Sequence, residues 1–235
     1  MPYNWDDYGQ ERLLSRNKLL LPHHRQAHNL LLAYLAEIDP SAQILDIGCG
    51  DGFYLEMLRN LGFTNILGID PSNTQLAKAR AKNLPVSLGQ IEGLATPTHP
   101  LCRKQYDVVL LWDLIEHLED PTTALQTVHR LLKPGGCCFI NTVVCDSIHA
   151  RLSRLLKKQN RLRQTQAIDA SHIQPFTKKA IINLLTGQGF EILCAKRCGN
   201  RWPYFSKHNW HWLSSWTLFG TCGDILTIAC QKPTP

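Results

Sequence analysis

Ile44-Leu45-Asp46-Ile47-Gly48-Cys49-Gly50-Asp51-Gly52 is the stretch that decides the fold of this chain. Its first five residues predict a short buried strand, apolar apart from Asp46. Glycines at every second position then predict a tight turn, because glycine tolerates positive φ and lets a ligand approach the backbone closely. A helical pattern begins at Phe53. A strand, a glycine turn and a helix N-terminus together form the nucleotide-binding corner of a doubly wound α/β sheet.

The spacing of the glycines indicates what this corner would bind. It is Gly-x-Gly-x-Gly, and not the Gly-x-Gly-x-x-Gly of a pyrophosphate binder. Asp46, two residues before the first glycine, would repel a phosphate. The corner therefore suits a cationic ligand, such as one carrying ammonium or sulfonium groups.

Composition places the chain among ordinary globular proteins. The 235 residues are 44% hydrophobic and 19% charged, and no apolar run reaches the roughly 20 residues that span a bilayer. The first residues carry acids where a signal peptide needs basic and apolar ones, which predicts a cytoplasmic protein. Nine cysteines without one Cys-x-x-Cys pair indicate neither a zinc ribbon nor a disulfide framework.

Strand and helix patterns alternate along most of the chain. Residues 1–43 are predicted to form an N-terminal helical cap, and residues 44–235 one domain with no internal repeat or linker. The predicted strands are 44–48, 65–70, 86–89, 106–111, 137–144, 190–195 and 224–230. The unbroken apolar run of 106–111 predicts the central strand of the sheet.

Further along the chain, three residues fit the recognition of a nucleoside: Asp70, Gln90 and Ile91. Asp70 lies at the end of the second strand, where an acid can accept hydrogen bonds from both ribose hydroxyls. The structural alternative for Asp70 is a helix cap. Gln90 and Ile91 follow the third strand, in the position where an adenine ring would be packed and its amine read.

Taken together, these motifs resemble the class I S-adenosylmethionine-dependent methyltransferases, and particularly the ubiquinone-biosynthesis O-methyltransferases. The resemblance rests on residues 44–52, Asp70, residues 106–118, residues 131–136 and Gly189-Phe190. It implies an α/β fold with a doubly wound, seven-stranded and mostly parallel sheet (a Rossmann-like fold), with a helical insertion after the fifth strand. It also implies that the cofactor is S-adenosylmethionine.

The resemblance assigns further residues to the cofactor. Gly48, Cys49 and Gly50 would bring the backbone against its methionine and ribose parts, and Asp46 would place a carboxylate near its positive end. Trp112 would lie between adenosine and methionine, and Arg25 would reach a carboxylate from the cap. This chain departs from the family at Gln90, where an acid is usual, and at Trp112, where a smaller residue is commoner.

A methyl acceptor must lose a proton, so a base is needed near the site. His117 and His172 are the candidates, since histidine titrates near neutrality. The alternative for each is a capping or packing role. A further alternative places Asp113, Glu116 and His117 on one helical face as metal ligands, although no metal is part of the predicted site.

The net charge of +6 has one local source. Six cations and no acid lie between Arg151 and Arg163, within a predicted amphipathic helix of residues 146–166. This helix belongs to a predicted basic lid insertion, residues 145–171. Three interpretations are open: a lid with a solvated basic face, peripheral membrane contact through residues 148–163, or an RNA contact. Nucleic acid is the least favoured partner.

The sequence thus predicts a methyltransferase with a small, hydrophobic or aromatic acceptor, and oxygen is the favoured acceptor atom. An RNA or protein methyltransferase is the alternative enzyme. A non-catalytic scaffold that binds the cofactor is the alternative from another class.

Overall fold

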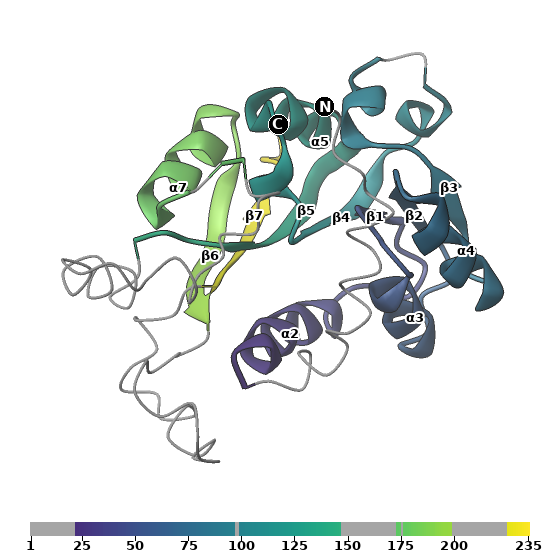
Figure 1. Ribbon diagram of the computed structural model, residues 1–235. Helices are drawn as coiled ribbons and strands as arrows, with labels where there is room; N and C mark the ends of the chain where they lie inside the picture. Colours follow the sequence, from purple (N-terminus) through teal and green to yellow (C-terminus); the bar gives the residue numbers. More distant parts are fainter. Residues whose placement is uncertain (1–21, 97–98, 147–172, 175, 199–224) are drawn as a thin grey trace, which may run out of the picture.

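The computed structural model describes residues 22–96, 99–146, 173–174, 176–198 and 225–235, and in residues 22–25 only the backbone. Seven strands form one sheet in the order β3-β2-β1-β4-β5-β7-β6 (Figure 1). Strands β1 to β5 run parallel, whereas β7 is antiparallel to both β5 and β6. The doubly wound, mostly parallel sheet predicted from the sequence is confirmed. The strands are β1 (Ile44–Ile47), β2 (Ile66–Asp70), β3 (Val86–Leu88), β4 (Tyr106–Trp112), β5 (Leu132–Val143), β6 (Glu191–Cys198) and β7 (Ile225–Gln231).

Helices cover both faces of the sheet, as parallel strands joined by crossovers require (Figure 1). One face packs against α2 (Pro22–Leu35), α3 (Phe53–Asn60) and α4 (Asn73–Ala81). The other packs against α5 (Pro121–Leu131), α7 (Lys178–Gly187) and the short 3₁₀ helices η2 (Ile91–Ala95) and η4 (Ile115–His117). A third 3₁₀ helix, η3, spans Pro100–Arg103.

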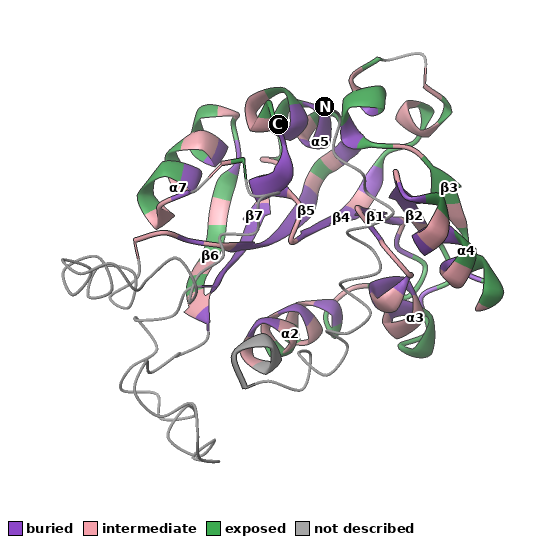
Figure 2. Cartoon of the chain, in the orientation of Figure 1, coloured by how far each residue is buried: buried purple, intermediate pink, exposed green. Residues whose placement is uncertain are grey.

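The central strands are buried on both faces (Figure 2). Alternate residues of β4 contribute to different cores: Val109 and Leu111 to the side of α5 and α7, Leu110 and Trp112 to the side of α2 and α3. β4 is the fourth of the seven strands, so the prediction of a central position is confirmed.

Side chains cap the helices where the sequence suggests it. Ser72 Oγ accepts a hydrogen bond from Gln75 N at the start of α4, and Thr177 Oγ1 accepts one from Ala180 N at the start of α7. These caps fix where each helix begins relative to the strand before it. The fifth strand, predicted over residues 137–144, begins earlier in the structure, because β5 starts at Leu132, which pairs with Tyr106.

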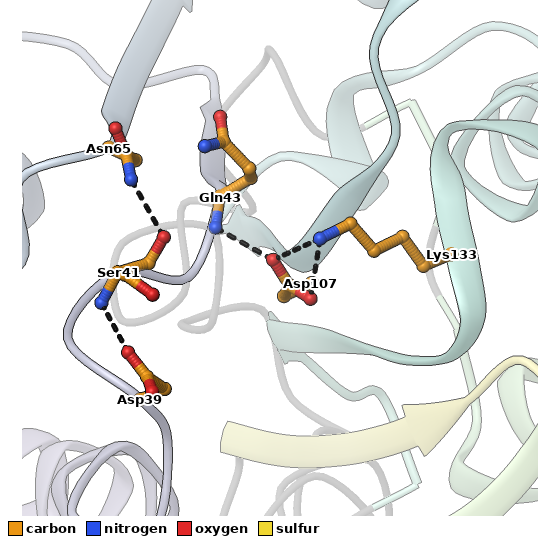
Figure 3. A network of polar contacts seen from close by, with 6 residues as sticks. All are labelled: Asp39, Ser41, Gln43, Asn65, Asp107 and Lys133. Atoms are coloured by element: carbon orange, nitrogen blue, oxygen red, sulfur yellow. Dashed lines mark hydrogen bonds and ion pairs between the residues drawn. The ribbon is translucent and has the colours of Figure 1, made fainter.

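A polar network joins the loop before β1 to the start of β4 (Figure 3). Asp107 accepts hydrogen bonds from Gln43 N at 2.8 Å and from Lys133 Nζ at 2.7 and 2.9 Å. In the same loop, Ser41 O accepts a bond from Asn65 Nδ2 at 2.7 Å. The network connects the N-terminal ends of β1, β2, β4 and β5. It lies away from the C-terminal ends of these strands, which remain available for ligands.

Several predictions lie outside the described residues. They are the cap residues 1–21, most of the basic lid insertion 145–171 with its membrane-contact segment 148–163, and His172. Among the helices that the structure does describe, none is long and apolar enough to cross a membrane.

Candidate active site

The glycine corner adopts the backbone conformation that its sequence predicts. The backbone φ angles of Gly48, Gly50 and Gly52 are 80°, 54° and 80°, and residues other than glycine rarely adopt such values. The amides of Gly48 and Cys49 donate to Ile69 O at 2.8 and 3.0 Å, which anchors the turn to β2. A Cβ added to Gly50 would meet nothing within 4 Å, so this glycine borders open space.

Asp70 connects the end of β2 to this corner. Its Oδ2 accepts a hydrogen bond from Gly50 N at 2.8 Å, and its Oδ1 accepts one from Ser72 N at 2.8 Å. Only 8% of the residue is exposed. The helix-capping alternative is therefore partly realised, since Asp70 binds the backbone just before α4, but Ser72 is the residue that caps the helix.

Asp46 lies in β1 just before the corner and is almost completely buried, with 1% exposed. Its Oδ2 has no hydrogen-bond partner among the described residues. Burial raises the pKa of Asp46 to about 7, and the negative charge of Asp70 makes a smaller contribution to the same shift. A buried carboxylate oxygen without a hydrogen-bond partner costs free energy when the group is charged, and a nearby cation would offset that cost.

The third wall of the site comes from the end of β4. Asp113 has φ of 50°, and its Oδ1 accepts a hydrogen bond from Asn141 Nδ2 at 2.8 Å. Asn141 Oδ1 in turn accepts one from Thr227 Oγ1 at 2.9 Å. Three strands thus hold Asp113 in an uncommon backbone conformation, of a kind that is concentrated at functional sites.

These walls enclose a pocket at the C-terminal ends of β1, β2 and β4, where ligands bind in open α/β sheets. Its lining residues are Ile47, Gly48, Gly50, Asp70, Pro71, Ser72, Gln75, Gly89, Gln90, Ile91, Glu92, Asp113, Leu114, His117 and Leu118. The pocket brings together six of the residues predicted from the sequence, namely Gly48, Gly50, Asp70, Gln90, Ile91 and His117. Gln75 and Leu114 were not predicted, because nothing in the helix or loop pattern distinguishes them.

Three other predicted residues are described but lie behind this lining. Asp46 is buried in β1, and the Cys49 side chain lies where a Cβ on Gly68 would contact it. The Trp112 ring packs against Tyr54, with ring centroids 4.5 Å apart, and against His28 at 5.5 Å. Arg25 lies in the first turn of α2, where only the backbone is described.

The metal-binding alternative is not supported by the geometry. Asp113 precedes a one-turn 3₁₀ helix instead of sharing a helical face with Glu116 and His117. Thr142 Oγ1 donates to Glu116 Oε2 at 2.8 Å, which directs that carboxylate toward β5. Among the described residues, no group of three or more His, Cys, Asp or Glu side chains could hold a metal ion.

Comparison with known proteins agrees with this site. Residues 21–195 match the family model of the methyltransferase domain. The ubiquinone biosynthesis O-methyltransferase of Shewanella pealeana is 34% identical over 124 residues, which are 49% of this chain and 52% of that protein. Its counterpart from Pseudomonas aeruginosa is 36% identical over 103 residues, 43% of this chain and 44% of that protein. The chain thus spans about half the length of the curated relatives it matches.

Solved structures show the same fold. A methyltransferase of Thermotoga maritima, described as a possible histamine N-methyltransferase, superposes with a TM-score of 0.63 at 20% identity and covers 97% of this chain and 100% of its own. The magnesium protoporphyrin IX methyltransferase of Synechocystis, solved with bound S-adenosylhomocysteine, gives 0.62 at 15% identity, with 90% and 84% covered.

The chain belongs to the methyltransferase domain family, and its fold is that of the class I S-adenosylmethionine-dependent methyltransferases. Its cofactor is S-adenosylmethionine. The residues present fit this cofactor in two respects: the open space over Gly50 admits a ligand against the backbone, and the unpartnered buried carboxyl of Asp46 suits a cation.

Proposed function

We propose that the pocket at the ends of β1, β2 and β4 binds S-adenosylmethionine and that the enzyme methylates a hydroxyl group of a small aromatic or hydrophobic acceptor. Asp70 would hold the ribose, Gln90 and Ile91 the adenine, and the backbone of Gly48 and Gly50 the methionine part. The bound cofactor supplies an activated methyl group on a sulfonium leaving group. The protein then has to align the acceptor and remove its proton.

The observation that carries the choice of oxygen is the similarity to the ubiquinone biosynthesis O-methyltransferases. It extends over 124 and 103 residues at 34 and 36% identity, about half of each relative. The aromatic or hydrophobic character of the acceptor is proposed from the same similarity, because His28, Phe53, Tyr54 and Trp112 pack against one another and none of them is among the residues that line the pocket.

We propose His117 as the base for this transfer. It lines the pocket, and η4 fixes its backbone through a bond from His117 N to Leu114 O at 2.9 Å. Only 4% of the residue is exposed, so bulk water has little access to the ring. His172, outside the described residues, stays the second candidate from the sequence.

Transfer of a labelled methyl group to matched acceptors tests the proposal. A catechol, the corresponding aromatic amine, bulk RNA and liposomes carrying a polyprenyl phenol would each be incubated with the enzyme and labelled S-adenosylmethionine. We expect label in the catechol or the polyprenyl phenol, and not in the amine. Label in the amine alone would overturn O-methylation, and label in RNA would favour the alternative enzyme class.

The liposome arm also tests peripheral membrane contact through residues 148–163. If that contact exists, the lipid-borne phenol should be methylated faster on anionic than on neutral vesicles, and added salt should remove the difference.

A substitution distinguishes His117 acting as a base from His117 acting only in packing. His117→Gln should lower kcat by about 100-fold, the usual size of a general-base contribution, and leave the affinity for S-adenosylmethionine within about twofold. Equal losses in both quantities would mean that His117 only supports the fold of the pocket.

A further inference from the structure

Asp46 is the most isolated ionisable group near the pocket. It is 1% exposed, and its neighbours at the same register of the sheet are Gly68 on β2 and Leu110 on β4, neither of which can carry charge. Its Oδ2 has no hydrogen-bond partner among the described residues. A carboxylate in such a place lacks both solvent and a compensating charge.

The charged groups on the surrounding elements do not compensate a negative charge on Asp46. Lys82, the residue that ends α4, pairs with Asp51 at 3.5 Å and with Glu56 at 3.3 Å, and not with Asp46. Asp70 and Asp113 add negative charge at the ends of β2 and β4.

The remaining titratable neighbours are uncharged or engaged elsewhere. Burial raises the pKa of the Cys49 thiol, so it stays neutral at physiological pH. The Tyr54 hydroxyl and His28 Nε2 share a hydrogen bond of 2.9 Å. In the described part of the chain, therefore, no cation is paired with Asp46.

We propose that Asp46 selects for positive charge in the cofactor site: it holds a proton while the site is empty and releases that proton to solvent when the cationic cofactor binds. The inference rests on the cofactor site proposed above. Atoms and charge balance, because one carboxylic acid becomes one carboxylate and one proton enters the buffer. The negative charge thus forms only when a positive charge is present to compensate it.

This arrangement makes cofactor affinity depend on pH. In the empty protein the pKa of Asp46 is about 7, and an adjacent cation lowers the pKa of a carboxyl. Below pH 7, binding must therefore displace a proton, and the affinity falls as the pH falls. Between pH 8 and pH 6 the dissociation constant should rise about tenfold, as expected for one proton and a pKa near 7.

Isothermal titration calorimetry in two buffers with different ionisation enthalpies counts the released protons directly. At pH 6.5 the full chain should release roughly 0.7 proton on binding S-adenosylmethionine, because about three quarters of Asp46 is then protonated. Adenosine, which has the ribose and adenine but no positive charge, is the matched ligand and should release none.

The substitution Asp46→Asn completes the test. It should abolish proton release and weaken S-adenosylmethionine binding by about tenfold or more, while adenosine binding changes less than about twofold. If Asp46→Asn fails to fold, the proton count and pH dependence of the unaltered protein still decide the matter. Binding without proton release, or equal release with adenosine, would overturn the inference and leave the proposed function intact. An absence of S-adenosylmethionine binding would overturn both.

Discussion

The carboxylate of Asp70 accepts a hydrogen bond of 2.8 Å from the backbone amide of Gly50, across the gap between β2 and the glycine corner. Its other oxygen accepts one from Ser72 N. A carboxylate can accept several hydrogen bonds at once, so binding these two amides is compatible with the proposed bonds from the hydroxyls of a ribose. The same side chain thereby shapes the corner and presents a ligand-binding group to the pocket.

Gly50 allows a direct test of the corner. In Gly50→Ala, the added methyl group enters open space and the positive φ is retained at a cost of about 1 kcal/mol. The protein should therefore fold, but a Cβ in the pocket should weaken S-adenosylmethionine binding by about tenfold or more, measured by calorimetry.

Gly62→Ala is the matched control. Gly62 also has positive φ, and a Cβ added to it would meet nothing within 4 Å, but it lies beyond the far end of α3 and does not line the pocket. The two variants should lose similar stability in urea titrations, and only Gly50→Ala should lose affinity. Equal affinities would show that the ligand does not approach Gly50.

Asp107 should contribute more to stability than the ion pair that it forms. Lys133→Met removes only a partly exposed ion pair and should cost about 0.5–1 kcal/mol. Asp107→Ala also leaves Gln43 N without its 2.8 Å acceptor and should cost about 2–3 kcal/mol. Urea titrations of both variants measure the difference, and equal losses would contradict the importance that the structure gives to the Gln43 bond.

Asn141 should affect both the stability of the sheet and the affinity of the site for the cofactor. Asn141→Leu removes the bonds that its side chain makes with Asp113 Oδ1 and Thr227 Oγ1, and should lower the free energy of unfolding by about 2–4 kcal/mol. Because the Asp113 side chain then loses this bond, cofactor affinity should fall as well. Thr227→Val, the control, removes the outer bond and the contact with Cys198 Sγ but keeps the bond from Asn141 to Asp113, so it should cost less stability and keep the affinity. A loss of affinity in Thr227→Val would show that the effect passes through the fold as a whole.

Asp46 should make the empty protein less stable as the pH rises. Its pKa in the folded state is about 7, against 3.8 for an unperturbed group, so the folded state binds more protons between these values. Stability contributed by the protonated form is complete near pH 4 and is lost by about pH 7, in total roughly 4 kcal/mol as an order of magnitude. Asp46→Asn should therefore be more stable than the unaltered protein at pH 7 and lack this slope. Parallel pH profiles of the two proteins in urea would contradict the assignment.

The elements of the nucleotide-binding half could be predicted from the sequence because their signals are local. Three glycines at alternate positions, an acid at the end of a strand and an unbroken apolar run each reflect a backbone or burial requirement that one segment meets alone. The N-cap at Ser72 is a signal of the same kind. Hence the central position of β4 agrees between sequence and structure, and Gly48, Gly50 and Asp70 lie together in one pocket.

Long-range features could not be predicted in the same way. The bonds from Asn141 to Asp113 and Thr227 join residues 28 and 86 positions apart, and no periodic pattern records them. The orientation of Trp112 toward Tyr54 and His28 depends on where α2 packs. The alternative that places Asp113, Glu116 and His117 on one helical face is not realised, because Asp113 has positive φ and precedes the short 3₁₀ helix η4.

Equilibrium binding of S-adenosylmethionine to Asp70→Ala tests the central claim, that this pocket is the cofactor site of a methyltransferase. We predict binding weaker by about 1.5–3 kcal/mol than in the unaltered protein, since hydrogen bonds to a charged group are lost. Asp51→Ala, a neighbouring acid that does not line the pocket, should bind within about twofold of the unaltered protein. Unchanged affinity in a folded Asp70→Ala variant would contradict the placement of the cofactor in this pocket.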